Sequence, residues 1–459
     1  MSEQRHSASF RDPSGFLFRR NEIIYRQVNH LYRKHYEKLM LSGLYDRLVK
    51  QKLLIPHKEV TDIGPPDRKN AYKVLKPECI PFISYPYEWC FSQLKDSALL
   101  TLNIHKIALE SGMILKDASA YNVQFLNGLP VFIDTLSFET YKEGSLWPAY
   151  RQFCQHFLAP LALMSKKDIR LSQLLKVYLD GIPLELASSL LPGRSYLSLS
   201  LLSHIHFHAK GQKHFEDKLV KIKPRKLRKT SHLALIDNLS SSVRKLQWQP
   251  EGTEWGEYYD DTNYSKDAFE HKKKIVSDFL DQSGHGSVWD LGANTGVFSK
   301  IAAGKGRKTI SFDVDQACVE KNYTSCKESG ERNVLPLVMD FVNPSSGIGW
   351  ENKERYSLDE RAQADTVMAL ALIHHLAISN NLPLNLIAGF FSRICQNLII
   401  EFTPKSDSQV QRLLMNRVDI FPEYKQEFFE KEFSVYFNIK NTQPIPESER
   451  IIYLLQCKI

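Results

Sequence analysis

The sequence predicts an α/β protein of two domains, in which an N-terminal α+β domain precedes a C-terminal domain built on a largely parallel sheet. Its 459 residues exceed the length at which one hydrophobic core usually stops growing. After residue 251, short apolar strands alternate with helices, which is typical of a parallel sheet with helices on both faces. We therefore expect domains at 1–208 and 251–459, joined by a basic linker at 209–250.

The composition narrows the functional class. With 43% hydrophobic and 24% charged residues, the chain can bury sizeable cores, and this composition argues against global disorder. The net charge of +8 is modest for this length, which argues against a nucleic-acid partner. The seven cysteines form no C-x-x-C pair and indicate reduced thiols. No apolar stretch approaches the ~20 residues that span a bilayer, so we expect a cytoplasmic protein without a membrane span; nothing indicates its oligomeric state.

The N-terminal domain shows hairpins and long helices. Residues 15–28 contain two short apolar runs around a polar Arg-Arg-Asn-Glu, which predicts a hairpin. Apolar residues at helical spacing predict helices over 28–40 and 91–112. Gly43 follows the first helix closely, and the second helix ends at Gly112. The Asn-Gly pair at 127–128 separates two strand-like runs and is the strongest short hairpin signal. The chain looks mostly helical over 145–208.

Three polar residues of this domain have the spacing of a phosphotransferase catalytic loop: Asp117, Asn122 and Asp134. In such loops one Asp contacts the acceptor hydroxyl, while the Asn and the second Asp hold magnesium. The segment resembles the catalytic loops of protein kinases and aminoglycoside phosphotransferases, which implies a kinase-like domain and ATP with Mg as ligands. Lys73 is a candidate nucleotide-binding lysine.

The segment also departs from the kinase pattern. A Leu-Lys pair precedes the first Asp where these families have His-Arg or His-Gly, and Thr-Leu follows the second Asp instead of Phe-Gly. No glycine-rich phosphate loop is visible. The domain is interpreted as an active phosphotransferase, a divergent or inactive version of one, or an unrelated helical domain.

A basic stretch at 210–229 contains nine Lys and Arg residues against two acids. Such a run is usually a solvated linker or an exposed helix between domains. The alternative is a binding patch for a phosphorylated or nucleic-acid partner. No aromatic-rich segment accompanies the basic stretch. Its absence favours a linker over a binding patch.

In the C-terminal domain, strands and helices are expected to alternate along the chain. We expect strands at 287–291, 309–314, 334–341, 364–372 and 397–402, and helices at 265–280, 296–303, 316–326 and 384–394. Two further strands lie around a proline-rich turn near the end of the chain. They are expected to form an antiparallel edge hairpin, which mixed sheets accommodate.

The loop after the first of these strands has the features of a cofactor site. It contains Asp290, Gly292, Asn294 and Gly296 and leads into a helix. Small residues let backbone N–H groups approach a ligand at the helix N-terminus. A dinucleotide site requires G-x-G-x-x-G, with a glycine that leaves room for pyrophosphate. Here an acid precedes the first glycine and would repel pyrophosphate, but could pair with a ligand ammonium.

With this loop, residues 251–459 resemble the class I S-adenosylmethionine-dependent methyltransferases, whose first motif is an acidic residue followed by G-x-G-x-G or a close variant. The resemblance implies a Rossmann-like sheet and S-adenosyl-L-methionine as cofactor, bound by the four loop residues. Asp313 falls where the family places the acid that accepts hydrogen bonds from the ribose hydroxyls. Asp340 falls where the family's side chain approaches the adenine amino group, and the next residue, Phe341, is expected to pack on the ring. Asn294, in place of the middle glycine, departs from the motif.

Two histidines, His374 and His375, follow the fourth strand on the expected substrate side. Either could act as a general base that takes a proton from an acceptor hydroxyl or amine; alternatively, they serve only packing. Glu401 ends the fifth strand and is either near the acceptor or a structural partner. No metal site is expected in this domain.

We therefore expect an S-adenosylmethionine-dependent methyltransferase that acts on a small-molecule or saccharide acceptor, with the N-terminal domain in substrate recognition. Two alternatives stay open. One is a bifunctional kinase-methyltransferase, and the other is a non-catalytic ligand-sensing scaffold.

Overall fold

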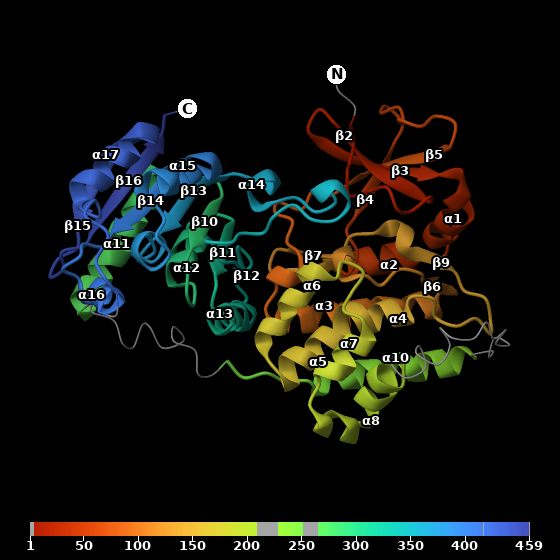
Figure 1. Cartoon of the computed structure of the whole chain (residues 1–459). Helices are drawn as coiled ribbons and strands as arrows, with labels where there is room; N and C mark the ends of the chain where they lie inside the picture. Colours follow the sequence, from red (N-terminus) through yellow and green to blue (C-terminus); the bar gives the residue numbers. More distant parts are fainter. Residues whose placement is uncertain (1–3, 209–227, 251–264, 416, 459) are drawn as a thin grey trace. The chain divides into compact units, whose positions relative to one another are not determined.

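The computed structural model describes residues 4–208, 228–250, 265–415 and 417–458, and the chain divides into two compact units (Figure 1). Unit 1 consists of Met1–Trp248 with Gly347–Arg355, and unit 2 of Gln249–Ser346 with Tyr356–Ile459. Among the helices of the described residues, none is long and apolar enough to cross a membrane.

Unit 1 begins with a five-stranded antiparallel sheet in the order β1-β2-β3-β5-β4. The expected hairpin at 15–28 is confirmed, since β2 pairs with β3 from Gly15↔Val28 to Arg20↔Ile23. The following helix begins later than expected, because residues 28 and 29 still belong to β3. The bounds are β1 Gln4–Arg5, β2 Gly15–Arg20, β3 Ile23–Asn29, α1 Arg33–Leu41, α2 Leu44–Lys50, β4 His57–Val60 and β5 Ala71–Pro77.

The rest of unit 1 is mainly helical around the long helix α3, as expected for 91–112 and 145–208. The hairpin at 127–128 is confirmed: Asn127 and Gly128 have φ of 51° and 68°, which an Asn-Gly turn tolerates. The elements are α3 Phe91–Glu110, β6 Met113–Leu115, β7 Val123–Leu126, β8 Leu129–Phe132, β9 Phe138–Thr140, α4 Tyr150–Phe153, α5 Ala159–Lys166, α6 Leu174–Val177, α7 Leu184–Leu190, α8 Leu199–Leu201 and α10 Lys229–Lys245.

The expected linker at 209–250 is wrong over its second half. Helix α10 occupies Lys229–Lys245 and packs on α3 inside unit 1. Lys95 Nζ donates to the carbonyl oxygens of Arg244 and Leu246, 3.0 and 2.7 Å away. The amphipathic pattern of 229–245 was obscured by the preceding basic run. Most of that run, 209–227, lies outside the described residues.

A short segment of the expected C-terminal domain also belongs to unit 1. Within Gly347–Arg355, Glu354 accepts two hydrogen bonds from Arg11, of 2.8 and 3.0 Å. The guanidinium of Arg355 lies 4.2 Å from the ring centroid of Tyr121. Glu354 is buried, and a buried carboxylate needs such a cationic partner. The contact spans more than 340 residues of sequence, so no local pattern could indicate it.

Unit 2 is built on a seven-stranded sheet in the order β12-β11-β10-β13-β14-β16-β15. The first five strands are parallel, and β16 pairs antiparallel with both β14 and β15. The α/β class and the antiparallel hairpin at the edge are thus confirmed. The strands are β10 Val288–Leu291, β11 Thr309–Asp313, β12 Val334–Val338, β13 Ala364–Ala369, β14 Cys395–Phe402, β15 Phe437–Pro444 and β16 Ile451–Cys457.

Helices connect these strands and bury the sheet. They are α11 Lys266–Gln282, α12 Val297–Gly304, α13 Gln316–Ser329, α14 Leu358–Arg361, α15 Leu384–Ile394, α16 Ser408–Leu414 and α17 Gln426–Tyr436. One core cluster joins α11 and α12 to the sheet through buried residues that include Phe279, Phe298 and Ile399. Each large apolar side chain buried in this way contributes roughly 1.5–3 kcal/mol.

The strand order reverses at β10. The chain proceeds outward from β10 to β11 and β12, then returns to the other side of β10 with β13 and β14. In open α/β sheets, ligands bind outside the carboxyl ends of the strands at such a switch point. The expected cofactor loop follows β10 and lies at this point.

Candidate functional site

A cavity of about 270 Å³ lies at the carboxyl ends of β10, β11, β12 and β13 in unit 2. The structure brings six of the seven expected cofactor residues to its wall: Asp290, Gly292, Asn294, Asp313, Asp340 and Phe341. Gly296 does not line the cavity but precedes α12 as its N-cap residue. Residues more than 50 positions apart thus meet at one edge of the sheet.

The loop after β10 has three residues in the left-handed region: Gly292, Asn294 and Gly296 with φ of 73°, 51° and 81°. Asn is among the few non-glycine residues that adopt this conformation readily, so the left-handed backbone at this position does not require a glycine. At Gly296 a Cβ atom would lie 2.4 Å from the side-chain amide of Asn322, so any larger residue would force this buried side chain to shift.

Asp290 lies on β10 and its carboxyl group is buried at the cavity. Ser299 Oγ, from the first turns of α12, donates a hydrogen bond of 2.6 Å to Asp290 Oδ2. Burial raises the pKa of Asp290 to about 7, against the opposing effect of the Ser299 hydrogen bond. This carboxyl group therefore changes charge near neutral pH.

Asp313 is the last residue of β11 and joins the two neighbouring loops. Its Oδ2 accepts the N–H of Asn294 at 2.7 Å, and its Oδ1 accepts the N–H of Asp315 at 2.8 Å. Burial raises the pKa of Asp313 to about 6, although these backbone hydrogen bonds oppose the shift. The carboxylate thus fixes the position of the glycine loop over the cavity.

Asp340 and Phe341 lie beyond the end of β12, which stops at Val338 rather than at 341 as expected. Asp340 is exposed, and its Oδ1 accepts the N–H of Val342 at 2.9 Å. Phe341 contacts Phe312 edge-on, with ring centroids 5.6 Å apart. One wall of the cavity therefore presents an aromatic ring beside a solvated carboxylate.

The structure separates the two candidate histidines. His375 lines the cavity at the start of the π-helix His375–Ser379, whereas His374 does not line it. His374 is fully buried, and its Nδ1 has no hydrogen-bond partner among the described residues. Burial lowers the pKa of His375 to about 4, with a further contribution from Arg450. His375 is therefore neutral at pH 7.

A buried ionic network, which the sequence analysis missed except for Glu401, lies against the same cavity. Lys272 Nζ of α11 donates to Glu401 Oε2 at 2.5 Å, and Lys272 lines the cavity. Arg450 donates to Glu401 Oε1 at 3.2 Å and to Asp407 Oδ2 at 2.7 Å. The backbone N–H of Ala371 donates to Glu401 Oε2 at 3.0 Å. The backbone of Ala371 lies in the left-handed region, with a φ of 49°. Lys272 lies among the buried, mostly apolar positions of α11, and a lysine at such a position is the sequence feature that could have indicated a buried ionic network.

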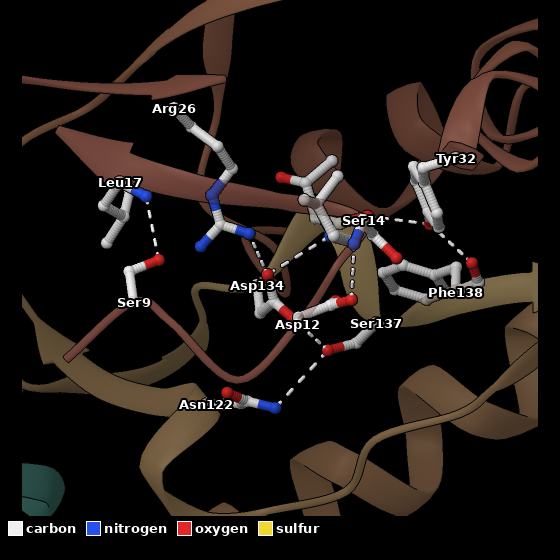
Figure 2. Close-up of polar contacts among 12 residues, drawn as sticks. Ser9, Asp12, Ser14, Leu17, Arg26, Tyr32, Asn122, Asp134, Ser137 and Phe138 are labelled. Atoms are coloured by element: carbon white, nitrogen blue, oxygen red, sulfur yellow. Dashed lines mark hydrogen bonds and ion pairs between the residues drawn. The ribbon is translucent and has the colours of Figure 1, made fainter. Parts of the chain in front are cut away.

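In unit 1 the three residues of the expected phosphotransfer site come together. Asp134 forms an ion pair with Arg26 of β3 and accepts a hydrogen bond from Ser137 (Figure 2). Asn122 Nδ2 donates to the same serine hydroxyl at 3.3 Å. Burial raises the pKa of Asp117, and the nearby Asp134 raises it further.

The same contacts do not fit a magnesium ion. Both carboxylate oxygens of Asp134 are engaged, and Arg26 supplies the positive charge that a metal would supply. Across the described residues, no group of three His, Cys, Asp or Glu side chains is arranged to hold a metal ion. Lys73 pairs with Glu59 of β4 at 2.6 Å, so Arg26 rather than Lys73 contacts the expected site.

The fold and the cavity define unit 2 as an α/β domain with a cavity at the switch point of its sheet. The chain belongs to the family of nodulation protein NoeA. It is 34% identical to that protein of Rhizobium meliloti (strain 1021) over 462 residues, which cover 98% of this chain and 96% of its relative. No family model matches the chain.

Two solved structures show weaker likenesses. Magnesium protoporphyrin IX methyltransferase (ChlM) from Synechocystis PCC 6803 with bound SAM is 18% identical, over 43% of this chain and 87% of that chain, with a TM-score of 0.30. The bifunctional kinase-methyltransferase WbdD is 14% identical, over 48% of this chain and 46% of that chain, also with a TM-score of 0.30.

Proposed function

We propose that unit 2 is an S-adenosylmethionine-dependent methyltransferase. The observation that carries this proposal is the arrangement of three acids, Asp290, Asp313 and Asp340, at the ends of three adjacent strands around one cavity. The sequence resemblance requires these acids in this order. Together with the left-handed glycine loop, they supply contacts for an ammonium, a ribose and an adenine.

The chemistry of the cavity wall fits this cofactor. The cofactor carries a sulfonium and an ammonium, both cationic, whereas a dinucleotide carries an anionic pyrophosphate that the acids would repel. Asp290 is a buried carboxyl group whose charged form a ligand ammonium would stabilise. Asp313 accepts two backbone N–H groups, and a carboxylate offers about four lone-pair sites, so it can also accept ribose hydroxyls. Phe341 offers a ring face or edge to adenine.

When bound, the cofactor supplies an electrophilic methyl group, so the protein mainly has to position the acceptor in line with it. His375 lies at the cavity and is neutral at pH 7, which allows it to accept a proton from an acceptor hydroxyl. We propose a small-molecule or saccharide acceptor. We further propose that unit 1 contributes substrate recognition. We propose no phosphotransfer step, because Arg26 and Ser137 engage Asp134.

Calorimetry on the full chain tests this function. We expect S-adenosylmethionine and S-adenosylhomocysteine to bind with one ligand per chain, and Asp313→Ala to weaken binding at least about tenfold, as expected for lost charge-assisted hydrogen bonds. Asp419→Ala is the matched control, because Asp419 is an exposed acid of unit 2 paired with Lys405. Absence of binding by the unchanged chain would favour a scaffold. Unchanged affinity in Asp313→Ala would refute the ribose contact.

A further inference from the structure

An apolar patch lies on the surface of unit 1, at α8 and the segments on either side of it (Figure 1). The 3-10 helix Gly193–Leu197 precedes α8, and the π-helix Leu202–His206 follows it directly. The four members of the patch are exposed to solvent: Leu197 by 86%, Leu199 by 83%, Phe207 by 56% and Tyr196 by 40%. Single exposed apolar residues are common on proteins, whereas a cluster of them marks an interaction surface.

The helical segment that carries this patch has polar side chains inside and apolar side chains outside. His204 and His206 are buried, and each is hydrogen-bonded through both ring nitrogens. The partners, at 2.6 to 2.9 Å, are Tyr150 and Asn238 for His204, and Ser188 and Ser195 for His206. Leu199, Ser203 and Phe207 follow one another at intervals of four residues, and all three are exposed. A surface helix of a globular protein normally has the opposite arrangement, so the outer face fits an apolar environment.

The charges near the patch indicate which kind of partner it fits. The sequence has no acidic residue between Glu185 and Glu216, and Arg194, two residues before the patch, is exposed. Helix α10 contacts α8, and its one acid, Asp237, is paired with Lys106 at 2.8 Å. In the sequence, the basic stretch at 210–229 follows the patch. The apolar side chains thus stand in a part of the chain whose charge is complementary to an anionic surface.

We propose that the apolar patch of unit 1 docks on the surface of an anionic lipid bilayer. Leucine and phenylalanine side chains enter the boundary between headgroups and acyl chains, while nearby Lys and Arg attract anionic headgroups. Tyr196 combines an aromatic ring with a polar tip, which suits the interface between lipid and water. Attachment of this kind requires no membrane-spanning helix. The inference goes beyond the proposed function and does not depend on methyl transfer.

Flotation of the full chain with lipid vesicles tests this docking surface. One set of vesicles consists of phosphatidylcholine alone, and the other contains phosphatidylcholine and anionic phosphatidylglycerol in equal amounts. We expect the anionic vesicles to bind the chain at least about tenfold more tightly, because basic residues near the surface attract anionic headgroups. The triple variant Leu197→Ser, Leu199→Ser, Phe207→Ser should lose at least about tenfold of that affinity, because it removes the apolar area that enters the bilayer.

A matched control lies elsewhere on unit 1. Leu31 and Leu41 are also highly exposed leucines, but they are distant in sequence from α8 and the basic stretch. The double variant Leu31→Ser, Leu41→Ser should therefore bind anionic vesicles as the unchanged chain does. All the substituted side chains are exposed, so neither variant should lower the melting temperature by more than a few degrees.

Loss of vesicle binding in the triple variant but not in the control supports the docking surface. Equal binding by the triple variant and the unchanged chain would show that another part of the protein attaches to the vesicles. Equal binding to both kinds of vesicle, or to neither, would refute an anionic bilayer as the partner. If light scattering instead shows a dimer that the triple variant abolishes, the patch is an interface between two copies of the chain, and the proposal is wrong.

Discussion

The affinity for S-adenosylmethionine should depend on pH through Asp290. Burial, the largest cause, raises the pKa of Asp290 to about 7. A bound ammonium stabilises the carboxylate, so binding lowers that pKa and requires loss of the proton. The contribution of the Asp290 carboxylate to the affinity is therefore complete only well above pH 7, and it is lost as the pH decreases through 7.

The size of the effect follows from linkage. With a pKa of about 7 in the free protein and a much lower one in the complex, the dissociation constant increases about twofold at pH 7 and about elevenfold at pH 6, relative to its value well above pH 7. Asp313, whose pKa is raised to about 6 mainly by burial, steepens the loss below pH 6 if the ribose contact also favours its carboxylate. The ligand's own α-amino group loses its proton near pH 8. The affinity should therefore be greatest between pH 7 and 8.

Calorimetry from pH 6 to 8.5, in buffers of different ionisation enthalpy, measures both the affinity and the proton released. 5′-Methylthioadenosine, which has no ammonium, should show a flatter profile. Asp290→Asn should bind S-adenosylmethionine more weakly and lose the dependence between pH 6 and 7. A constant affinity over that range in the unchanged protein would refute the pairing of Asp290 with the ligand ammonium.

Three other changes test the structural basis of the site. Gly296→Ala should lower the melting temperature and weaken cofactor binding, because the left-handed φ costs about 1–2 kcal/mol and the new Cβ meets Asn322; an unchanged melting curve would contradict the close contact. Glu401→Ala should lower the free energy of unfolding by about 3–5 kcal/mol, since two buried cations lose their shared partner. If denaturant titration shows a decrease below about 1 kcal/mol, the network is dispensable for stability. Arg26→Met should destabilise unit 1 by leaving Asp134 unpaired; if differential scanning fluorimetry instead shows stabilisation by magnesium in the variant, Arg26 replaces a metal there.

The sequence was sufficient to predict most of unit 2. The alternation of strands and helices depends on local periodicity, and the acids at strand ends meet because carboxyl ends of parallel strands share one edge. Asn294 stands where the motif has its middle glycine, but its φ of 51° is one that Asn tolerates, so this residue fits the left-handed backbone of the loop. The resemblance thus identified six residues that the structure places on one cavity wall.

Other parts of the site depended on contacts that no local pattern contains. Adjacent residues such as His374 and His375 look alike in sequence, and only the path of the chain after β13 shows which of them faces the cavity. The partners Lys272 and Glu401 are 129 residues apart, and Arg26 and Asp134 are 108 apart. Each pair is set by how the strands and helices pack, which periodicity does not specify.

A structure of the full chain with S-adenosylhomocysteine tests the central claim most directly. The account predicts the ligand in the cavity of unit 2, with its ribose hydroxyls on Asp313 and its ammonium facing Asp290. A ligand bound elsewhere, or one whose ribose and amino-acid end contact none of these side chains, would contradict the methyltransferase assignment of this site.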